Sequence, residues 1–368
     1  MKILILADMP APYRVDVFKG IAKEHCVDVF FKTCKDEARN AQWFVSPEAS
    51  LHFHVLNSKE SQKSYNACIK NIKAYDVVLC YDPWPARSRK LQRLCRRKHI
   101  PYALNADGAV DINMSFPKKQ IKTYYTKRAP LCLAGCEKAV AYFKAYGAQE
   151  ENIVRHPFSS LHADEIERRI PTDDEKSAVK KQLGMADKIT FLAVGQFIHR
   201  KGFDLLLEAW EKANCEGQLY IIGGGPSEAL YRSMIEKSGL QNVYILDYKR
   251  PAELRPYFLA SDVFVMPTRE DIWGLVINEA MAVGLPVITS DRCTAGVELI
   301  THGQSGYVYP CEDVAALAQH IKALHSHPDM RHRFSQNVLH TIQKYTIENI
   351  VQSHLASLRM LKNKEKTS

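Results

Sequence analysis

The stretch that decides the fold runs from Val263 to Thr289 and reads VFVMPTREDIWGLVINEAMAVGLPVIT. An apolar run, Val263–Met266, leads into a polar loop and then into a helix-like segment from Gly274 to about Val283. A second apolar run, Pro286–Thr289, follows directly. Two buried strands joined through a helix run parallel, because the helix carries the chain back to the edge of the sheet at which the first strand began. The stretch therefore predicts a parallel sheet with helices on its faces.

The same alternation of strand-like and helix-like segments extends along most of the 368 residues, a length that favours two domains. Expected strands are Lys2–Ala7, Cys26–Phe31, Leu51–Leu56, Val77–Cys80, Tyr102–Asn105, Leu131–Ala134, Lys188–Val194, Gln218–Ile222 and Val243–Leu246. Expected helices are Tyr13–Lys23, Ser61–Tyr75, Pro85–Lys98, Lys138–Tyr146, Gly202–Ala213, Ser227–Ser238, Val314–Leu324, Arg331–Gln343 and Thr346–Leu361.

The polar, charge-rich stretch Asp164–Lys188 interrupts this alternation and contains no obvious core strand. We therefore predict two doubly wound domains, residues 1–163 and 164–345. A C-terminal helix, residues 346–368, is expected to pack back on the N-terminal domain.

The composition is that of an ordinary globular protein, with 46% hydrophobic and 25% charged residues. No apolar run approaches the roughly 18 residues that a membrane span requires. The apolar run Lys2–Ala7 is too short for a signal peptide and meets Asp8. The ten cysteines form no Cys-x-x-Cys pair, which argues against a zinc site or a disulfide framework. A reducing cytoplasm is the expected location.

The net charge of +9 is distributed unevenly. Residues 1–160 hold 26 basic and 15 acidic side chains, whereas the remainder holds 24 and 26. Part of the excess lies in RSRKLQRLCRRKH, Arg87–His99. Such a helix suits anionic lipid, a phosphorylated acceptor or nucleic acid, and a solvated basic face is an equal alternative.

Two loops of the second half follow strands and open helices, where free backbone N–H groups and the helix dipole favour anions. In VGQFIHRKGF, Arg200 and Lys201 precede Gly202, and two cations at a helix start suit a diphosphate. In IIGGGPSE, Gly223–Gly225 let the backbone approach a ligand, although the third glycine of the dinucleotide fingerprint is missing. A plain loop and a tight turn are the respective alternatives.

Three acids mark the stretch with which we began. Glu270 and Asp271 are adjacent in the loop, and Glu279 lies in the helix-like segment among Ile277, Ala280 and Met281. An acid in such apolar surroundings needs a partner, and the two adjacent hydroxyls of a ribose would provide one.

The chain carries a family resemblance in the combination of Gly195, Arg200–Gly202, Gly223–Pro226 and DIWGLVINEAMAVGLPVI, residues 271–288. It resembles the retaining glycosyltransferases of family 4, whose GT-B fold has two facing Rossmann-like domains and an inter-domain cleft. The match covers nearly all of the second half. The first half matches loosely, through MPAPYR (Met9–Arg14) and NADGAV (Asn105–Val110).

The resemblance implies an enzyme that transfers a sugar from a nucleotide-diphosphate sugar to a hydroxyl of a glycan or lipid-linked acceptor. The product would be a cell-surface polysaccharide or glycolipid. The donor would bind in the second domain and the acceptor mainly in the first. With the donor as substrate, no cofactor is expected.

The family's acid pair is Glu-x7-Glu, and counting back from Glu279 reaches Asp271. Asp271 would then hold the donor-sugar hydroxyls and Glu279 the ribose, with Glu270 kept open as the sugar contact because Asp is one methylene shorter than Glu. Lys201 matches the lysine with which the family binds the donor phosphate. Relatives often have an arginine where this chain has Gln196, and Arg200 would supply that positive charge instead. Donor-binding candidates are Gln196, Gly224, Tyr248, Lys249, Glu270, Ile272, Trp273, Gly274, Leu275 and Glu279, and catalytic candidates in this half are Asp271, Arg200 and Lys201.

In the first half, Asp107 lies where relatives place a catalytic His or Asp, and a simple turn aspartate before glycine is the alternative. Arg14 stands where many relatives have a Gly-Gly loop. It would reach phosphate or acceptor, or else only cap a surface loop.

The resemblance favours front-face displacement, since no clear nucleophile for a covalent intermediate is present. No Asp-x-Asp triplet occurs, so we expect no metal requirement. The alternatives are another GT-B enzyme, such as a nucleotide-sugar 2-epimerase, and a non-enzymatic nucleic-acid binder. The latter would leave the phosphate loops without purpose, so no nucleic acid is expected. The basic first half suggests a peripheral position on the inner membrane surface.

Overall fold

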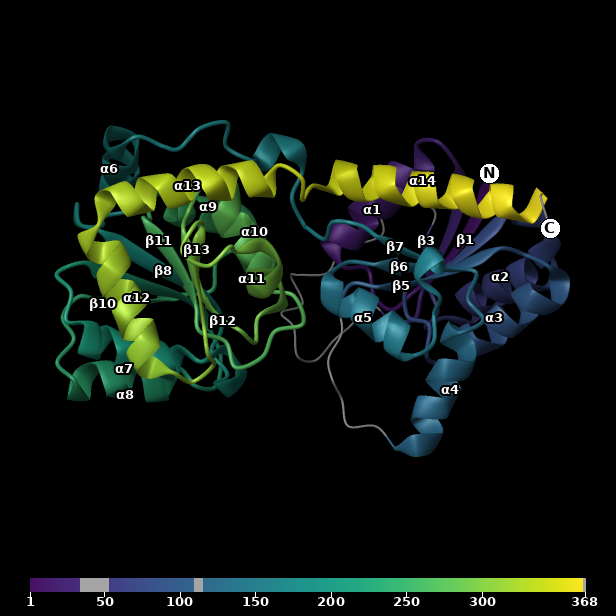
Figure 1. Ribbon diagram of the computed structural model, residues 1–368, viewed down its shortest axis with the longest axis horizontal. Coiled ribbons are helices and arrows are strands. Elements are labelled where there is room, and N and C mark those ends of the chain that lie inside the picture. The colour runs from purple at the N-terminus through teal and green to yellow at the C-terminus, as the bar shows by residue number, and fades with distance from the viewer. Residues whose placement is uncertain (34–52, 109–114, 367–368) are drawn as a thin grey trace. The chain divides into compact units, whose positions relative to one another are not determined.

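The computed structural model describes residues 1–33, 53–108 and 115–366 (Figure 1). The chain forms two compact units, one of Met1–Ser160 with Thr346–Ser368 and one of Leu161–Tyr345. The predicted strand Leu51–Leu56 and the NADGAV motif each lie partly outside the described residues.

The first unit is built on a seven-stranded parallel sheet in the order β3-β2-β1-β4-β5-β6-β7. Its central strands are buried on both faces, which explains why their sequences are continuous apolar runs. The strands are β1 (Lys2–Ala7), β2 (Cys26–Phe31), β3 (Phe53–Val55), β4 (Val77–Cys80), β5 (Tyr102–Ala106), β6 (Leu131–Ala134) and β7 (Ile153–Arg155). The helices are α1 (Pro12–Ala22), α2 (Lys59–Lys70), α3 (Ala86–Lys98), α4 (Phe116–Thr126), α5 (Glu137–Ala145) and α14 (Ile347–Lys366).

Helix α14 completes the first unit although it comes last in the chain. It contributes Ile350, Leu355 and Leu358 to the same core as Ile3 and Ile5 of β1. It also packs closely on α1, because a Cβ atom added to Gly20 would lie 2.4 Å from a methyl carbon of Val351.

The second unit is built on a six-stranded parallel sheet in the order β10-β9-β8-β11-β12-β13. Strands β11 and β12 pair in parallel through Phe264 and Val287, as the stretch Val263–Thr289 predicted. The strands are β8 (Thr190–Gln196), β9 (Gln218–Gly224), β10 (Val243–Asp247), β11 (Val263–Met266), β12 (Val287–Ser290) and β13 (Gly306–Tyr309). The helices are α6 (Asp173–Gln182), α7 (Phe203–Ala213), α8 (Glu228–Lys237), α9 (Pro251–Leu259), α10 (Leu275–Ala282), α11 (Thr294–Leu299), α12 (Val314–Ser326) and α13 (Pro328–Ile342).

The polar stretch after the first unit contains α6, which no apolar pattern had indicated. A capping box between Thr172 and Glu175 starts this helix. Lys176 then reaches the buried carboxylate of Asp262 at 2.9 Å. Charges, rather than an apolar stripe, therefore hold α6 to the unit.

Within the described part of the chain, no helix combines the length and the apolar character needed to cross a bilayer.

Candidate functional site

The predicted donor-binding loops meet at one edge of the second sheet. Strands β9, β8 and β11 are neighbours, and Gln196 at the end of β8 pairs with Gly224 at the end of β9. The loop from Thr268 to Trp273 leaves β11 at the same edge. Loops at the carboxyl ends of parallel strands are where ligands of such sheets bind.

An ion pair joins two of the catalytic candidates. Lys201 Nζ lies 2.5 Å from Asp271 Oδ2, and the two side chains are 14% and 13% exposed. Arg200 Nη1 donates to the backbone oxygen of Glu270 at 2.6 Å and lies 3.8 Å from Asp271 Oδ2. Residues some seventy positions apart in the sequence thus form one cluster of two cations and one carboxylate.

The two adjacent acids differ in their surroundings. The Asp271 backbone N–H donates to the oxygen of Arg292 at 3.0 Å, and the Asp271 carbonyl accepts from Thr294 N–H at 3.3 Å. The Glu270 side chain is exposed, and among the described residues none pairs with its carboxylate. The backbone therefore turns Asp271, and not Glu270, toward Lys201.

Arg269 anchors this loop, a role that the sequence pattern did not reveal. Its guanidinium donates to both carboxylate oxygens of Asp204 on α7, at 2.9 and 2.6 Å. It also donates to the backbone oxygen of His199 at 2.8 Å. A bidentate pair of this kind fixes orientation as well as distance. It therefore holds the loop that carries Asp271 close to the loop that carries Arg200 and Lys201.

Glycine is required at the two helix starts of the site. Gly202 has a φ of 69°, and a Cβ there would lie 2.2 Å from the carbonyl oxygen of Pro267. Gly274 has a φ of 99°, and a Cβ there would lie 2.7 Å from Cys293 Sγ. Both positions lie in the left-handed region that side chains avoid. Gly224, in contrast, has open space where a Cβ would be, so its backbone is accessible.

Helix α10 begins at Leu275 with Gly274 as its N-cap. The first N–H groups of a helix have no acceptor within it and can bind an anion. The side chain of Trp273 is buried and donates from Nε1 to Asn278 Oδ1 at 2.8 Å. Ile272, by contrast, exposes its side chain.

Glu279 is half-buried on α10. Burial, together with the nearby charge of Glu165, raises the pKa of the Glu279 carboxyl to about 7. In the described part of the chain no side chain donates a hydrogen bond to it. Its oxygens are therefore available to hydroxyl donors from outside the protein.

Tyr248 and Lys249 follow β10 at this same edge, since Asp247 at the end of β10 pairs with Gly223. Tyr248 is exposed. Lys249 Nζ lies 5.2 Å from the centre of the Tyr257 ring, a cation–π arrangement. The structure thus places both residues two strands away from the Lys201 loop.

In the first unit, Asp107 follows β5 and pairs with Arg14 of α1. Arg14 Nη2 lies 2.7 Å from Asp107 Oδ2, and Asn105 Nδ2 donates to Asp107 Oδ1 at 2.6 Å. Burial alone would raise the pKa of Asp107, but the charge and hydrogen bond of Arg14 outweigh it, and the net pKa is below the usual value. Asp107 is therefore ionised at neutral pH, and Arg14 is its ion-pair partner.

Two histidines extend this group, and the sequence carried no signal for either. His156 Nε2 lies 3.2 Å from Asn105 Oδ1, and its ring centre lies 4.7 Å from that of His354 on α14. His156 follows β7, a three-residue strand too short to be recognised by its pattern. Burial lowers the pKa of His354 to about 3, so that ring is neutral. A cavity of about 10 Å³ lies among Arg14, Asp107 and both rings.

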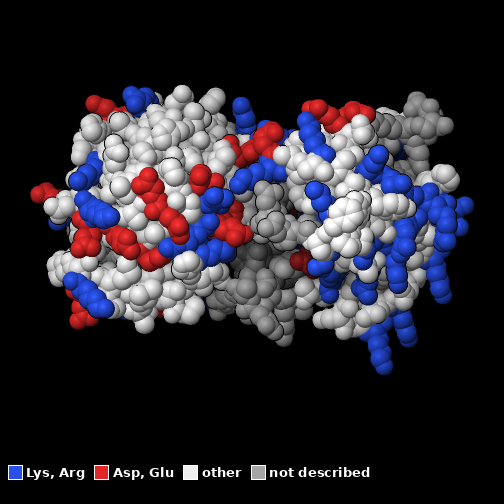
Figure 2. Space-filling view, turned by 60° about the horizontal axis from the view of Figure 1, so that its bottom comes forward, with Lys and Arg blue, Asp and Glu red and all other residues white. Residues whose placement is uncertain are grey.

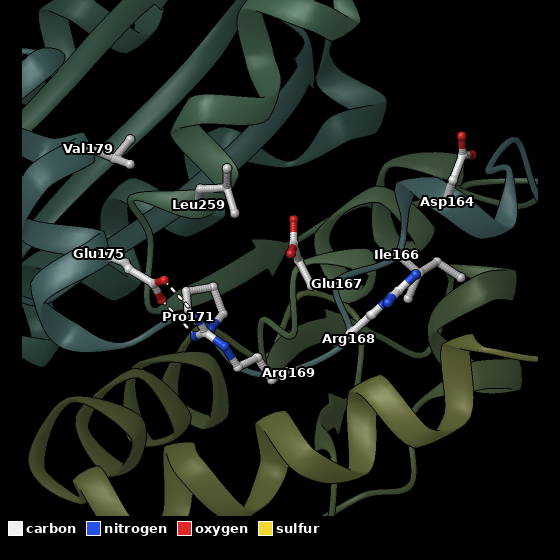
Figure 3. A pocket seen from close by; sticks show the side chains of 9 residues that line it. All are labelled: Asp164, Ile166, Glu167, Arg168, Arg169, Pro171, Glu175, Val179 and Leu259. Carbon is white, nitrogen blue, oxygen red and sulfur yellow. Dashed lines mark hydrogen bonds and ion pairs between the residues drawn. The ribbon is translucent and has the colours of Figure 1, made fainter.

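A larger cavity of about 490 Å³ lies elsewhere in the second unit (Figure 3). None of the predicted site residues lines it. Arg169 on its wall already donates to both oxygens of Glu175, at 2.8 and 2.6 Å, as the dashed lines in Figure 3 show. Its lining residues are Asp164, Ile166, Glu167, Arg168, Arg169, Pro171, Glu175, Val179 and Leu259.

No group of three or more His, Cys, Asp or Glu side chains within the described ranges is arranged to hold a metal ion. The charged groups that meet at the edge of the second sheet include Arg200, Lys201 and Asp271. This arrangement can bind a diphosphate through its cations and hydroxyls through its acids.

Comparison with known proteins agrees with this chemistry. The model of the family described as Glycosyl transferases group 1 matches residues 175–340. The amylovoran biosynthesis glycosyltransferase AmsK of Erwinia amylovora is 31% identical over 161 residues, 41% of this chain and 39% of that protein. The capsular polysaccharide biosynthesis glycosyltransferase CapM of Staphylococcus aureus is 24% identical over 217 residues, 57% and 56% of the two chains. The chain spans about half the length of the curated relatives it matches.

Solved structures extend the likeness to the whole chain. HepE of Anabaena in complex with UDP superposes with a TM-score of 0.79 at 17% identity, covering 98% of this chain and 100% of that one. Sucrose-phosphate synthase of Thermosynechococcus elongatus gives 0.75 at 18%, covering 99% and 100%. At these identities the likeness shows the fold, and the predicted GT-B fold is confirmed.

Proposed function

We propose that this protein is a retaining glycosyltransferase of family 4 that moves a sugar from a nucleotide-diphosphate sugar to a hydroxyl of a glycan or lipid-linked acceptor. The observation that carries the proposal is the cluster of Arg200, Lys201 and Asp271 at the sheet edge. The match of residues 175–340 to a glycosyltransferase family model supports it. HepE, with which the fold is shared, binds UDP, and AmsK and CapM are named for polysaccharide synthesis.

On the donor side, the diphosphate takes the place of Asp271 as the anion that Lys201 and Arg200 bind. Asp271 then turns to the hydroxyls of the donor sugar, which are neutral hydrogen-bond donors. Glu279 accepts from the ribose hydroxyls, and the N–H groups from Trp273 to Leu275 bind the diphosphate. The base lies toward Tyr248 and Lys249.

Transfer proceeds by front-face displacement. The acceptor oxygen attacks the anomeric carbon on the side from which the diphosphate departs, the bond from that carbon to phosphate oxygen breaks, and the acceptor proton passes to the leaving phosphate. Negative charge grows on the phosphate, so Arg200, Lys201 and the start of α10 stabilise the transition state electrostatically. No metal is needed for this step.

Asp107 supplies the catalytic carboxylate of the first unit. Its lowered pKa makes it a weak base, so we assign it to stabilising positive charge and orienting the acceptor hydroxyl. Arg14 is a positioning residue for Asp107.

A thermal-shift panel of nucleoside diphosphates and nucleotide sugars tests the donor half of the proposal, because a ligand that binds only the folded state raises its melting temperature. We expect a shift with a nucleoside diphosphate that Lys201→Ala abolishes. The anomeric configuration of the transferred sugar then tests retention. Consumption of nucleotide sugar without any acceptor would point to an epimerase, and no shift with any nucleotide would contradict the proposal.

A further inference from the structure

Helix α4 exposes an apolar face to solvent. Phe116 is 72% exposed, Ile121 41% and Tyr124 45%, all within nine residues. Large exposed side chains elsewhere in the described ranges, such as Leu230 and Val297, lie on separate helices. A cluster of this kind is a mark of a binding surface, whereas single exposed apolar residues are normal.

The three side chains share one side of the helix. At 3.6 residues per turn they fall within an arc of about 140°. The buried residues of α4, Tyr125 and Thr126, lie in its last turn, and Lys122 just before them donates to the Tyr142 hydroxyl at 2.8 Å. The beginning of the helix projects from the unit, as Figure 1 shows. The apolar face is therefore not part of a core.

Cations surround this face. Helix α3 and the segment 116–128 together contain twelve Lys and Arg residues and no acid. Figure 2 shows the blue side chains of this unit on the right, with few red ones among them. The exposed cations of α3 and the segment 116–128 that no described carboxylate pairs with are Lys90, Arg93, Arg97, Lys98, Lys118, Lys119, Lys127 and Arg128.

Arg96 of α3 joins the two helices into one surface through Tyr124 of α4, and Arg128 contacts the same ring. The Arg96 guanidinium lies 5.1 Å from the centre of the Tyr124 ring, and that of Arg128 lies 4.0 Å from it. The apolar face thus has a cationic border on both helices. A solvated basic helix would not need the apolar face, and double-stranded nucleic acid, which is bound chiefly through its phosphates and keeps its bases stacked, offers no partner for Phe116 and Ile121.

We propose that α4 docks on an anionic lipid bilayer, inserting Phe116, Ile121 and Tyr124 at the level of the headgroups. The cations of α3 and α4 then bind the lipid phosphates. Apolar side chains combined with a basic border are what an interfacial helix requires. This inference rests on the proposed function, since it places the enzyme where a lipid-linked acceptor is found.

Vesicle binding by the full chain tests the proposal. We expect sedimentation with phosphatidylcholine vesicles that contain phosphatidylglycerol, little with phosphatidylcholine alone, and release at high salt. Phe116→Ser with Ile121→Ser should lower partitioning by at least about tenfold. Leu230→Ser is the matched control, because Leu230 is 55% exposed on α8 of the other unit and should leave binding unchanged.

Fluorescence adds a measure of depth. The emission of a Phe116→Trp protein should shift to the blue on anionic vesicles, and that of Leu230→Trp should not. Equal binding by the double-serine protein and the control would overturn the proposal. The proposal would also be overturned if light scattering showed a dimer that the double-serine change dissociates. The apolar face of α4 would then bind a second copy of the chain and not a bilayer. Nucleotide thermal shifts, which depend on the second unit, separate this failure from failure of the proposed function.

Discussion

Replacing Asp271 with Asn tests which acid of the adjacent pair serves the site. The change removes the charge that Lys201 Nζ contacts at 2.5 Å, with both groups largely shielded from solvent. A hydrogen bond to a charged group of this kind contributes about 1.5–3 kcal/mol. Asn can still accept from Lys201, so we expect the free energy of unfolding to fall by about 1–2 kcal/mol. The contact with Arg200 at 3.8 Å adds at most about 1 kcal/mol, because Arg200 is well exposed.

The same substitution should reduce donor turnover. Loss of one charge-assisted hydrogen bond to a sugar hydroxyl lowers kcat/KM by about 10- to 150-fold. Glu270→Gln is the matched control, since its exposed side chain should change stability by less than about 0.5 kcal/mol. Urea unfolding and initial rates at low donor concentration measure both quantities. A larger loss in Glu270→Gln than in Asp271→Asn, by either measure, would refute the assignment.

The remaining predictions concern Glu279, the Lys201 loop, metal ions and the first unit. The pKa of Glu279 is raised from 4.5 to about 7, so its contribution to the stability of the free protein is fully present below pH 4.5 and is lost as the pH rises through 7. Because ribose hydroxyls bind the ionised form, calorimetric affinity for a nucleoside diphosphate should increase from pH 6 to pH 8, and Glu279→Gln should remove that dependence. Gly239→Ala should lower the free energy of unfolding by about 1 kcal/mol, because Gly239 has a φ of 61° but open space around it. Gly202→Ala should lower it further, because Gly202 has a similar φ and the added Cβ would also meet the Pro267 carbonyl oxygen. Chelator should leave the rate unchanged, and activity that returns only with Mg²⁺ or Mn²⁺ would contradict a metal-free mechanism. Asp107→Asn should lower kcat with little change in donor affinity, whereas weakened nucleotide binding would place Asp107 on the donor side.

Local sequence determined the layout of the sheets. A buried strand in a parallel sheet is a short apolar run, and the amphipathic segment after it forms the crossover helix. Each strand with its following helix can therefore be predicted from its own residues alone. Most predicted strands accordingly agree with the structure to within two residues, as β1 and β11 do. Elements held by charge, such as α6, or by few contacts, such as β7 and α4, carry no such pattern and were missed.

Tertiary structure decided which side chains meet. The resemblance to a known family pointed to Lys201, Asp271 and Glu279, but the contact between Lys201 and Asp271 depends on β8 and β11 being neighbours in the sheet. The pairing of Arg14 with Asp107 likewise joins residues 93 positions apart. Hydrogen bonds and ion pairs form only within about 3–4 Å, and that proximity is set by the order of strands and the packing of loops rather than by spacing along the chain.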